Sequence, residues 1–380
     1  MSRYFILAFL LIALGGCSSD DGTTGGSQGD ETPTDDPKPV SFERSTLLVN
    51  WADNIIVPSY EAFASELEVL QGTFEAFRSD ASTDNLVAFR AAWLSSYLAW
   101  QRVSMFEIGP AESAGFRLNI NTYPVDAEKV TANMNGTSDL ALPSNRDAKG
   151  FPALDYLING LADTDEAIVS KYNEADREQL LAYTDKVITD MVGLTGTVLS
   201  EWNNGYRNTF VSNDGASATA SVDRFVNDFI FYYEKFLRAG KMGIPLGVFS
   251  GSTLPDRVEA FHEGTISNTL FLEGLSAVQD FFNGKHFGSN ETGESLATYL
   301  ETLNSVKGGE SLTDLINTQF NKAKESVASL RPFKEELMEN TVPTEMGNAY
   351  DEVQRAIPLL KVDMVSAMSI SIDFVDADGD

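Results

Sequence analysis

Residues 149–160 read Lys-Gly-Phe-Pro-Ala-Leu-Asp-Tyr-Leu-Ile-Asn-Gly, and this stretch decides how the rest of the chain is interpreted. A glycine near each end frees the backbone there. Between and just beyond them, apolar residues recur at helical spacing, at Leu154, Leu157, Ile158 and Leu161. Pro152 suits a first helical turn, where its missing N–H costs nothing. Asp155 follows near the positive end of the helix. The residues alone fit either a short core helix with an acidic first turn or a helix that presents Asp155 for function.

The rest of the chain has the apolar spacing of helices, and the alternation typical of strands is rare. We therefore predict an all-α protein with two antiparallel helical bundles of about four helices each, packed side by side with a cleft between them. The predicted helices cover residues 42–79 with a kink at Pro58, 84–105, 123–134, 176–202, 222–239, 255–284 with a break at Gly264, 295–306, 311–330 and 344–370. A polar loop at 203–217 divides an N-terminal bundle, 42–210, from a C-terminal bundle, 218–375.

Composition excludes some partners and kinds of site. The chain has 380 residues, 27 of them basic and 56 acidic, for a net charge of -29. Because no basic stripe is present, we expect no nucleic-acid partner. Strong net charge keeps a protein soluble and favours a monomer. The single cysteine and two histidines exclude disulfides and most zinc hydrolase sites. No phosphate-binding glycine loop or serine-nucleophile elbow is present.

The first residues predict a route to the cell envelope. A short basic start, an apolar run and Gly15-Gly16-Cys17 resemble a bacterial lipobox, in which the cysteine is lipidated. We expect a signal peptide at 1–16, lipid on Cys17 and a disordered tether at 17–41. The alternative is an ordinary cleaved signal peptide. Residues 18–21, Ser-Ser-Asp-Asp, resemble a surface-export tag of Bacteroidetes lipoproteins. The expected location is the outer membrane, on its exposed or its periplasmic face.

Glu259, His262 and Glu263 form a cluster that combines histidine with carboxylates. On a helix their spacing would place them on one face. A Glu-x-x-His pair at that spacing contributes to metal sites in helical bundles, and Asp155 could add a ligand from across the cleft. The alternative is a solvated, salt-bridged helix face. A metal near Asp155, Glu259 and His262 is therefore kept as an alternative hypothesis, and we predict no cofactor.

Several stretches together resemble the imelysin family. The central stretch is similar to the family signature Gly-x-His-x-x-Glu, with Gly150 in place, Pro152 at the His position and Asp155 at the Glu position. Residues 92–102, 106–110, 121–124, 238–247 and 259–263 are similar to its other motifs, so the resemblance covers nearly all of the chain after the signal peptide. It implies two helical bundles with a cleft lined by these motifs. Family members are envelope proteins linked to iron or haem acquisition, and some are described as metallopeptidases.

The resemblance predicts a set of cleft residues for ligand binding: Trp100, Arg102, Glu107, Gly109, Pro110, Tyr123, Gly150, Pro152, Asp155, Lys241, Glu259, His262 and Glu263. Arg102 is expected to pair with Asp155 or with an anionic ligand, the alternative being a surface arginine. Trp100 also fits a core position, and Gly109, Pro110 and Gly150 also fit roles in loop shape.

Three functional hypotheses follow. The first is a non-catalytic lipoprotein that binds a small ligand or an envelope protein in the cleft, in iron or haem acquisition. The second is a metallopeptidase with an altered ligand set. The third is a surface interaction module whose cleft is idle. Proline offers a metal no lone pair, so Pro152 favours a protein that is not an enzyme, with no catalytic residues and no bound metal.

Overall fold

In the computed structural model, residues 42–136, 138–340 and 342–372 are described, and they are almost entirely helical. The predicted all-α class is confirmed. The strands among these residues are β1 (Val306–Lys307) and β2 (Glu310–Ser311), which pair as a short hairpin. The predicted signal peptide, the lipidation site Cys17 and the tether lie outside the described residues. No helix in the described ranges combines the length and hydropathy needed to cross a bilayer.

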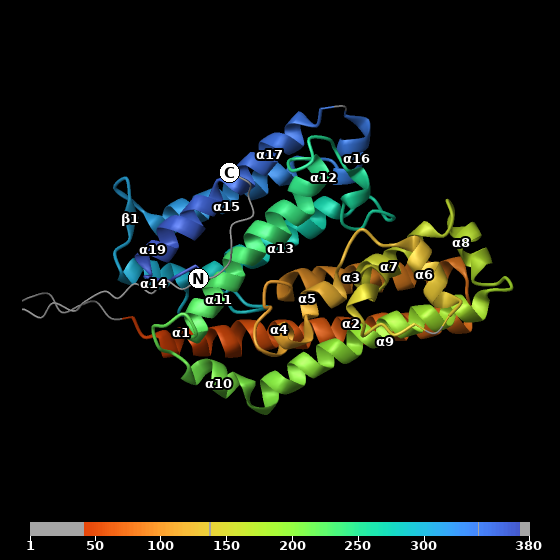
Figure 1. Ribbon diagram of the computed structural model, residues 1–380, viewed down its shortest axis with the longest axis horizontal. Coiled ribbons are helices and arrows are strands. Elements are labelled where there is room, and N and C mark those ends of the chain that lie inside the picture. Colours follow the sequence, from red (N-terminus) through yellow and green to blue (C-terminus); the bar gives the residue numbers. More distant parts are fainter. Residues whose placement is uncertain (1–41, 137, 341, 373–380) are drawn as a thin grey trace, which may run out of the picture. The chain divides into compact units, whose positions relative to one another are not determined.

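The first half of the chain forms a layer around three long helices (Figure 1). The helix α2 packs along both α3 and α9, and the shorter helices cover this group. Along α9, Leu180, Val187, Met191 and Val198 are buried at helical spacing, which explains its packing. The bounds are α1 Arg44–Asn50, α2 Val57–Ser79, α3 Thr83–Val103, α4 Pro110–Ala114, α5 Phe116–Ile120, α6 Ala127–Met134, α7 Gly150–Asp155, α8 Asp165–Lys171, α9 Arg177–Glu201 and α10 Arg207–Ser212.

The second half builds another group of helices, in which α15 packs against both α13 and α17 (Figure 1). The helix α13 also packs against α3, so the two groups share an interface. The bounds are α11 Ser221–Phe231, α12 Ile244–Leu246, α13 Ser267–Phe282, α14 Leu296–Thr302, α15 Leu312–Ala328, α16 Phe333–Glu339, α17 Thr344–Gln354, α18 Ala356–Pro358 and α19 Val365–Ala367.

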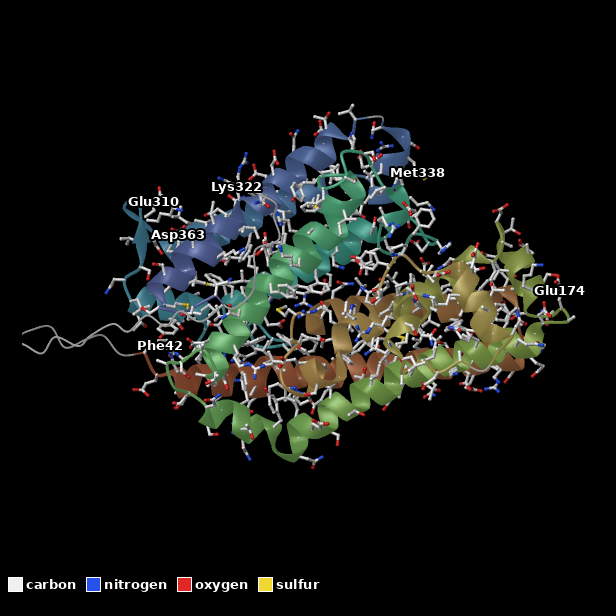
Figure 2. The ribbon with its side chains drawn as sticks, in the orientation of Figure 1. Phe42, Glu174, Glu310, Lys322, Met338 and Asp363 are labelled. Atoms are coloured by element: carbon white, nitrogen blue, oxygen red, sulfur yellow. The ribbon has the colours of Figure 1, made fainter. Side chains whose placement is uncertain are left out.

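Side chains from both groups join in one hydrophobic core (Figure 2). Trp51, from the first helical segment, packs on Phe225 and Phe281 of the second group, with ring centroids 5.2 and 4.9 Å apart. The described residues all belong to one compact unit. The predicted division into domains at 42–210 and 218–375 stays a prediction.

Wide π-helical turns interrupt or extend several helices, at Trp51–Ile56, Tyr156–Gly160, Trp202–Tyr206, Tyr232–Gly243 and Leu359–Met364. The first lies directly before Pro58, where the sequence predicted a kink. Such turns are rare and occur often at functional sites. Two of them belong to the imelysin-like motifs, because one follows Asp155 and another carries Lys241.

Some predicted element boundaries are wrong. Residues 109–121 form α4 and α5, and much of the predicted loop 203–217 is helical. The helix through 222–239 does not stop at Gly240 but runs on to Leu246. The predicted helix from 255 is a short 3₁₀ turn, Pro255–Arg257, followed by non-helical turns until α13 begins at Ser267. Tyr123 precedes α6, which begins at Ala127 with Asp126 as its N-cap.

Candidate functional site

The central stretch begins a helix where two backbones approach each other closely. Gly150 has a φ of 69°, and a Cβ there would lie 2.0 Å from the carbonyl oxygen of Ile120. Only glycine fits this position without displacing the neighbouring chain. Pro152 lies in the first turn of α7, as predicted, and every residue from Gly150 to Asp155 is buried. The local sequence therefore fixes where α7 starts and how deeply Asp155 sits.

Asp155 binds the backbone of a distant segment. Its Oδ2 accepts a hydrogen bond from the backbone N–H of His262 at 2.8 Å. Its Oδ1 accepts from the backbone N–H of Glu263 at 2.9 Å and from Nδ2 of Asn159 at 3.0 Å. Asp155 is only 2% exposed, and this burial raises the pKa of its carboxyl. The three hydrogen-bond donors act in the opposite direction, and the resulting pKa is about 6. Both carboxylate oxygens are thus occupied by protein donors.

A buried ion pair lies in the same region. The side chain of Lys241 pairs with Glu259, and the two residues are 5% and 1% exposed. Glu259 Oε1 also accepts from Nε2 of Gln101 at 3.2 Å and from Nδ2 of Asn121 at 2.7 Å. Burial lowers the pKa of Lys241, and the Glu259 carboxylate opposes that shift. Four separate segments of the chain meet at this one carboxylate.

Tyr97 lies close to both buried carboxylates. Its hydroxyl donates to Oδ1 of Asn121 at 2.7 Å, and its ring stacks on Phe151 at 4.2 Å with an interplanar angle of 3°. Burial raises the pKa of Tyr97 well above its usual value, and the negative charges of Glu259 and Asp155 raise it further. The phenol therefore stays protonated and serves as a hydrogen-bond donor.

A pocket of about 390 Å³ opens beside this network, and we name it the motif pocket. One wall is held by Arg90, whose Nη1 lies 2.6 Å from Oδ1 of Asp165 and whose Nε and Nη2 donate to the carbonyl of Ile158 at 2.9 and 2.7 Å. The lining residues are Arg90, Ala91, Trp93, Leu94, Asn159, Ala162, Asp163, Thr164, Asp165, Ile168, His262, Glu263 and Ile266. Apolar rings and chains thus face a set of acidic groups.

His262 contributes a neutral imidazole to the motif pocket. Its ring packs on Tyr156 with centroids 5.2 Å apart. A Cβ on Gly160 would lie 2.5 Å from its Nδ1, so the glycine leaves room for the ring. Burial, together with the positive charge of Lys334, lowers the pKa of His262 to about 4. The ring is therefore uncharged at neutral pH.

The predicted helical face of Glu259, His262 and Glu263 is wrong. These residues lie in turns, with positive φ values of 55° at Ala260 and 83° at Gly264. The backbone N–H groups of His262 and Glu263 donate to the carboxylate of Asp155. In a helix, these N–H groups would instead donate to backbone carbonyls of the preceding turn. Glu259 consequently points into the buried ion pair, while His262 and Glu263 line the motif pocket.

The predicted pair between Arg102 and Asp155 is not formed. Arg102 Nη1 lies 2.8 Å from Oδ2 of Asp280, and Arg102 Nε pairs with Glu273, both on α13. Arg102 lines a separate pocket of about 570 Å³. The structure therefore brings Asp155, Glu259, His262 and Glu263 together and leaves Arg102 apart.

Glu107 belongs to another buried charged group. Its Oε2 accepts the backbone N–H of Arg117 at 2.8 Å, and its own backbone N–H donates to Asp228 at 3.0 Å. Arg117 Nη2 binds both oxygens of Asp228, at 3.0 and 3.1 Å. Burial raises the pKa of Glu107 to about 7 and that of Asp228 to about 6. Sequence reasoning missed Arg117 and Asp228, although a charge within an apolar helical stretch was an available signal.

The remaining predicted residues have other surroundings. Trp100 is buried in the core. Gly109 has a φ of 53°, and a Cβ there would overlap the ring of Tyr206. Pro110 is buried at the start of α4. Tyr123 lines a further pocket of about 520 Å³ but also lies close to the buried network, because burial and then the charge of Glu259 raise its pKa well above the usual value. The amides of Gln101, Asn121 and Asn159, which complete the buried network, were not predicted as site residues, although Gln101 and Asn121 lie inside recognised motifs.

In the ranges that the structure describes, no three or more His, Cys, Asp or Glu side chains are grouped so that they could hold a metal ion.

The imelysin family model matches residues 56–358. This chain belongs to the imelysin family. The motifs that carried the resemblance thus come from a shared ancestry of most of the chain. Within the imelysin family, the chain departs from the signature described above at two positions, Pro152 and Asp155.

Relatives and solved structures agree with this assignment. Iron-regulated protein A of Synechococcus elongatus is 25% identical over 225 residues, which cover 56% of this chain and 57% of that protein. The match thus spans less than two thirds of that relative's length. An imelysin-like protein of Psychrobacter arcticum has a TM-score of 0.67 at 17% identity, covering 87% of this chain and 97% of its own. A Parabacteroides distasonis protein, named as an iron-regulated protein A precursor, has a TM-score of 0.67 at 15% identity, covering 85% and 95%. These two likenesses show the fold.

Proposed function

We propose that this chain is a non-catalytic, ligand-binding member of the imelysin family that acts in the cell envelope in iron acquisition. Membership of the family and a relative named Iron-regulated protein A support the link to iron. The lipobox-like start supports the envelope and an anchor on Cys17. The ligand site in this proposal is the motif pocket.

The state of the Asp155 carboxylate carries the non-catalytic part of the proposal. A catalytic zinc or iron site needs about three protein ligands and one open position. Pro152 has no lone pair to offer at the first signature position. At the second, both oxygens of Asp155 accept hydrogen bonds from His262, Glu263 and Asn159. The residues present therefore do not fit the metal that the family signature implies.

The same bonds give the signature a different use. Asp155 fixes the backbone of the segment that bears His262 and Glu263, and both side chains line the motif pocket. Glu259 and Lys241 anchor the preceding turn of that segment. Rigid support behind a pocket wall lowers the entropy lost when a ligand binds. The pocket joins an apolar side with Trp93 to an acidic rim, and its size suits a small ligand.

Binding of iron-bearing probes to the purified full-length protein tests the proposal. Ferric citrate and hemin are each titrated by equilibrium dialysis. We expect saturable one-to-one binding of at least one of these two probes. Ala162→Trp fills the motif pocket without removing any bond to Asp155 and should abolish that binding.

Ala182→Trp is the matched control, because Ala182 is an exposed alanine of α9 outside the pockets described above. It should bind as the parent does. Failure of both probes to bind, or equal binding by Ala162→Trp and Ala182→Trp, would contradict the assignment of the motif pocket. Chelator-sensitive proteolysis would contradict the non-catalytic part.

A further inference from the structure

The pocket lined by Arg102, which we name the Arg102 pocket, is larger than the motif pocket and lies at the α3–α13 interface. Its volume is about 570 Å³, within the range of small-molecule sites. It lies near the C-terminal ends of α3 and α13, and residues 285–290 form another wall. Its apolar lining comprises Ile55, Met105, Phe106, Ala277, Phe281 and Phe287.

One wall of the Arg102 pocket is polar and incompletely paired. Arg102 binds Glu273 through Nε and Asp280 through Nη1, and its Nη2 donates to no protein acceptor in the described ranges. Lys285 Nζ lies 3.5 Å from Oδ1 of Asp280, a distance too long for a strong hydrogen bond. Within the described part of the chain, this wall therefore keeps one donor group, Nη2 of Arg102, without a protein acceptor.

Lys324 adds a positive charge beside this wall. It is half-buried on α15 and has no hydrogen bond or ion pair among the residues that the structure describes. Burial lowers its pKa, and repulsion from Lys285 and Arg102 lowers it further against the attraction of Asp280. In the described ranges, Arg102 pairs with Glu273 and Asp280, and Lys285 lies near Asp280. Three basic side chains thus gather beside these two carboxylates, in a chain whose net charge is -29.

His286 supplies a further unsatisfied group on the same pocket. Its Nε2 is buried and has no hydrogen-bond partner among the residues that the structure describes, while its Nδ1 lies 3.7 Å from Oε2 of Glu291. Buried polar atoms in folded proteins almost always have a partner, so one without a partner at a pocket wall points to a missing ligand or solvent group.

We propose that the Arg102 pocket binds a small organic anion, with its carboxylate against Arg102 and Lys285 and its apolar body among Phe106, Phe281 and Phe287. The planar guanidinium suits a carboxylate, which can accept from more than one N–H. The unpaired charge of Lys324 adds attraction for an anion and none for a neutral molecule. The aromatic rings favour an anion with an apolar part over a simple inorganic ion. This site is independent of the motif pocket and of the proposed role in iron acquisition.

Calorimetric titration of the full-length protein with 4-phenylbutyrate tests the inference. Its uncharged amide controls for the carboxylate, and inorganic phosphate controls for the apolar body. We expect saturable binding of 4-phenylbutyrate with a Kd on the order of 1 mM or tighter, given the ligand's size. The amide and phosphate should each bind at least about tenfold more weakly. Added salt should weaken the binding of the carboxylate.

Two charge variants and a matched control locate the site. Lys324→Met and Lys285→Met should each weaken binding of 4-phenylbutyrate by about fivefold or more. Lys322→Met removes an exposed lysine two positions earlier on the same helix and should leave binding within about twofold; Figure 2 marks this residue on α15. Thermal melting confirms that each variant is folded. Equal binding of acid and amide, equal Kd values for Lys324→Met and Lys322→Met, or no saturable binding by the folded parent would each overturn the proposal.

Discussion

The carboxylate of Asp155 accepts the backbone N–H of His262 at 2.8 Å, across 107 positions of sequence. This bond joins the first turns after Gly150 to a segment of the other helix group. A second bond, to the N–H of Glu263, uses the other oxygen of the same carboxylate. The acid of the family signature is therefore a positioning residue in this protein, and the segment that it holds forms a wall of the motif pocket.

Removing the Asp155 carboxylate should destabilise the protein. Asp155→Ala leaves two backbone N–H groups without an acceptor in a buried region, at an expected cost of about 2–3 kcal/mol in the free energy of unfolding. Urea denaturation measures this change. Asp163→Ala, an exposed carboxylate on the rim of the same pocket, is the control and should change stability by no more than about 0.5 kcal/mol. Equal stabilities of the two variants would contradict the role given to Asp155.

The same carboxyl should make stability depend on pH. Burial raises its pKa from 3.8 to about 6 in the folded state, so the folded protein binds more protons than the unfolded chain between those values. Its contribution to stability is therefore present at low pH and lost as pH rises through the folded pKa. The free energy of unfolding should fall less steeply between about pH 4 and about pH 6 in Asp155→Asn than in the parent, by up to about 1.4 kcal/mol per pH unit. Parallel pH profiles would show that this carboxyl does not titrate as described.

Two glycines provide a test of the backbone geometry that starts α7. Gly150→Ala places a Cβ 2.0 Å from the carbonyl oxygen of Ile120 at a φ of 69°, and we expect a loss of about 2 kcal/mol or more. Gly72→Ala adds a methyl group to an exposed position of α2 with nothing within 4 Å, and it should stabilise by about 0.5–1 kcal/mol. Thermal unfolding of both variants gives the comparison. If Gly150→Ala left the unfolding temperature unchanged, the backbones at Gly150 and Ile120 would not approach each other as closely as the structure shows.

Breaking the buried ion pair from one side should be severe. Lys241→Met leaves the carboxylate of Glu259 buried without a counter-charge, at an expected cost of about 3–5 kcal/mol. The double variant Lys241→Met, Glu259→Gln removes both charges and keeps an acceptor for Gln101 and Asn121. It should recover about half of that loss or more. Additive effects in a double-mutant cycle would show that the two charges do not interact.

The helical class was predictable because it depends on local spacing of apolar residues, as along α9. The start of α7 was predictable for the same reason, since Gly150 and Pro152 act locally. The segment from 259 to 263 was not, because its backbone N–H groups bond to Asp155 rather than to their own turn. The sequence of residues 259–263 does not indicate that Asp155, 107 positions away from His262, accepts these hydrogen bonds.

The partners of charged residues were also hard to predict. Arg102 was correctly placed on a helix, but 56 acidic residues are available in the chain. Its partners, Glu273 and Asp280, are set by how α13 packs on α3, which is a tertiary property. The motifs correctly indicated that Asp155 and Glu259 lie in one region, whereas the buried pair of Arg117 and Asp228 lay outside every motif that was used.

Metal content of the purified full-length protein tests the central claim most directly. The apo protein is dialysed at neutral pH against zinc and against ferrous ion, each at a concentration well above that of the protein. Bound metal is then measured by atomic emission. The variants Asp155→Asn and His262→Ala are dialysed in parallel. If Asp155 positions the segment at His262 and Glu263, the protein retains no stoichiometric metal at the signature residues and does not cleave unfolded protein substrates. One tightly held metal ion per chain that is lost in both variants, together with chelator-sensitive proteolysis, would contradict that account.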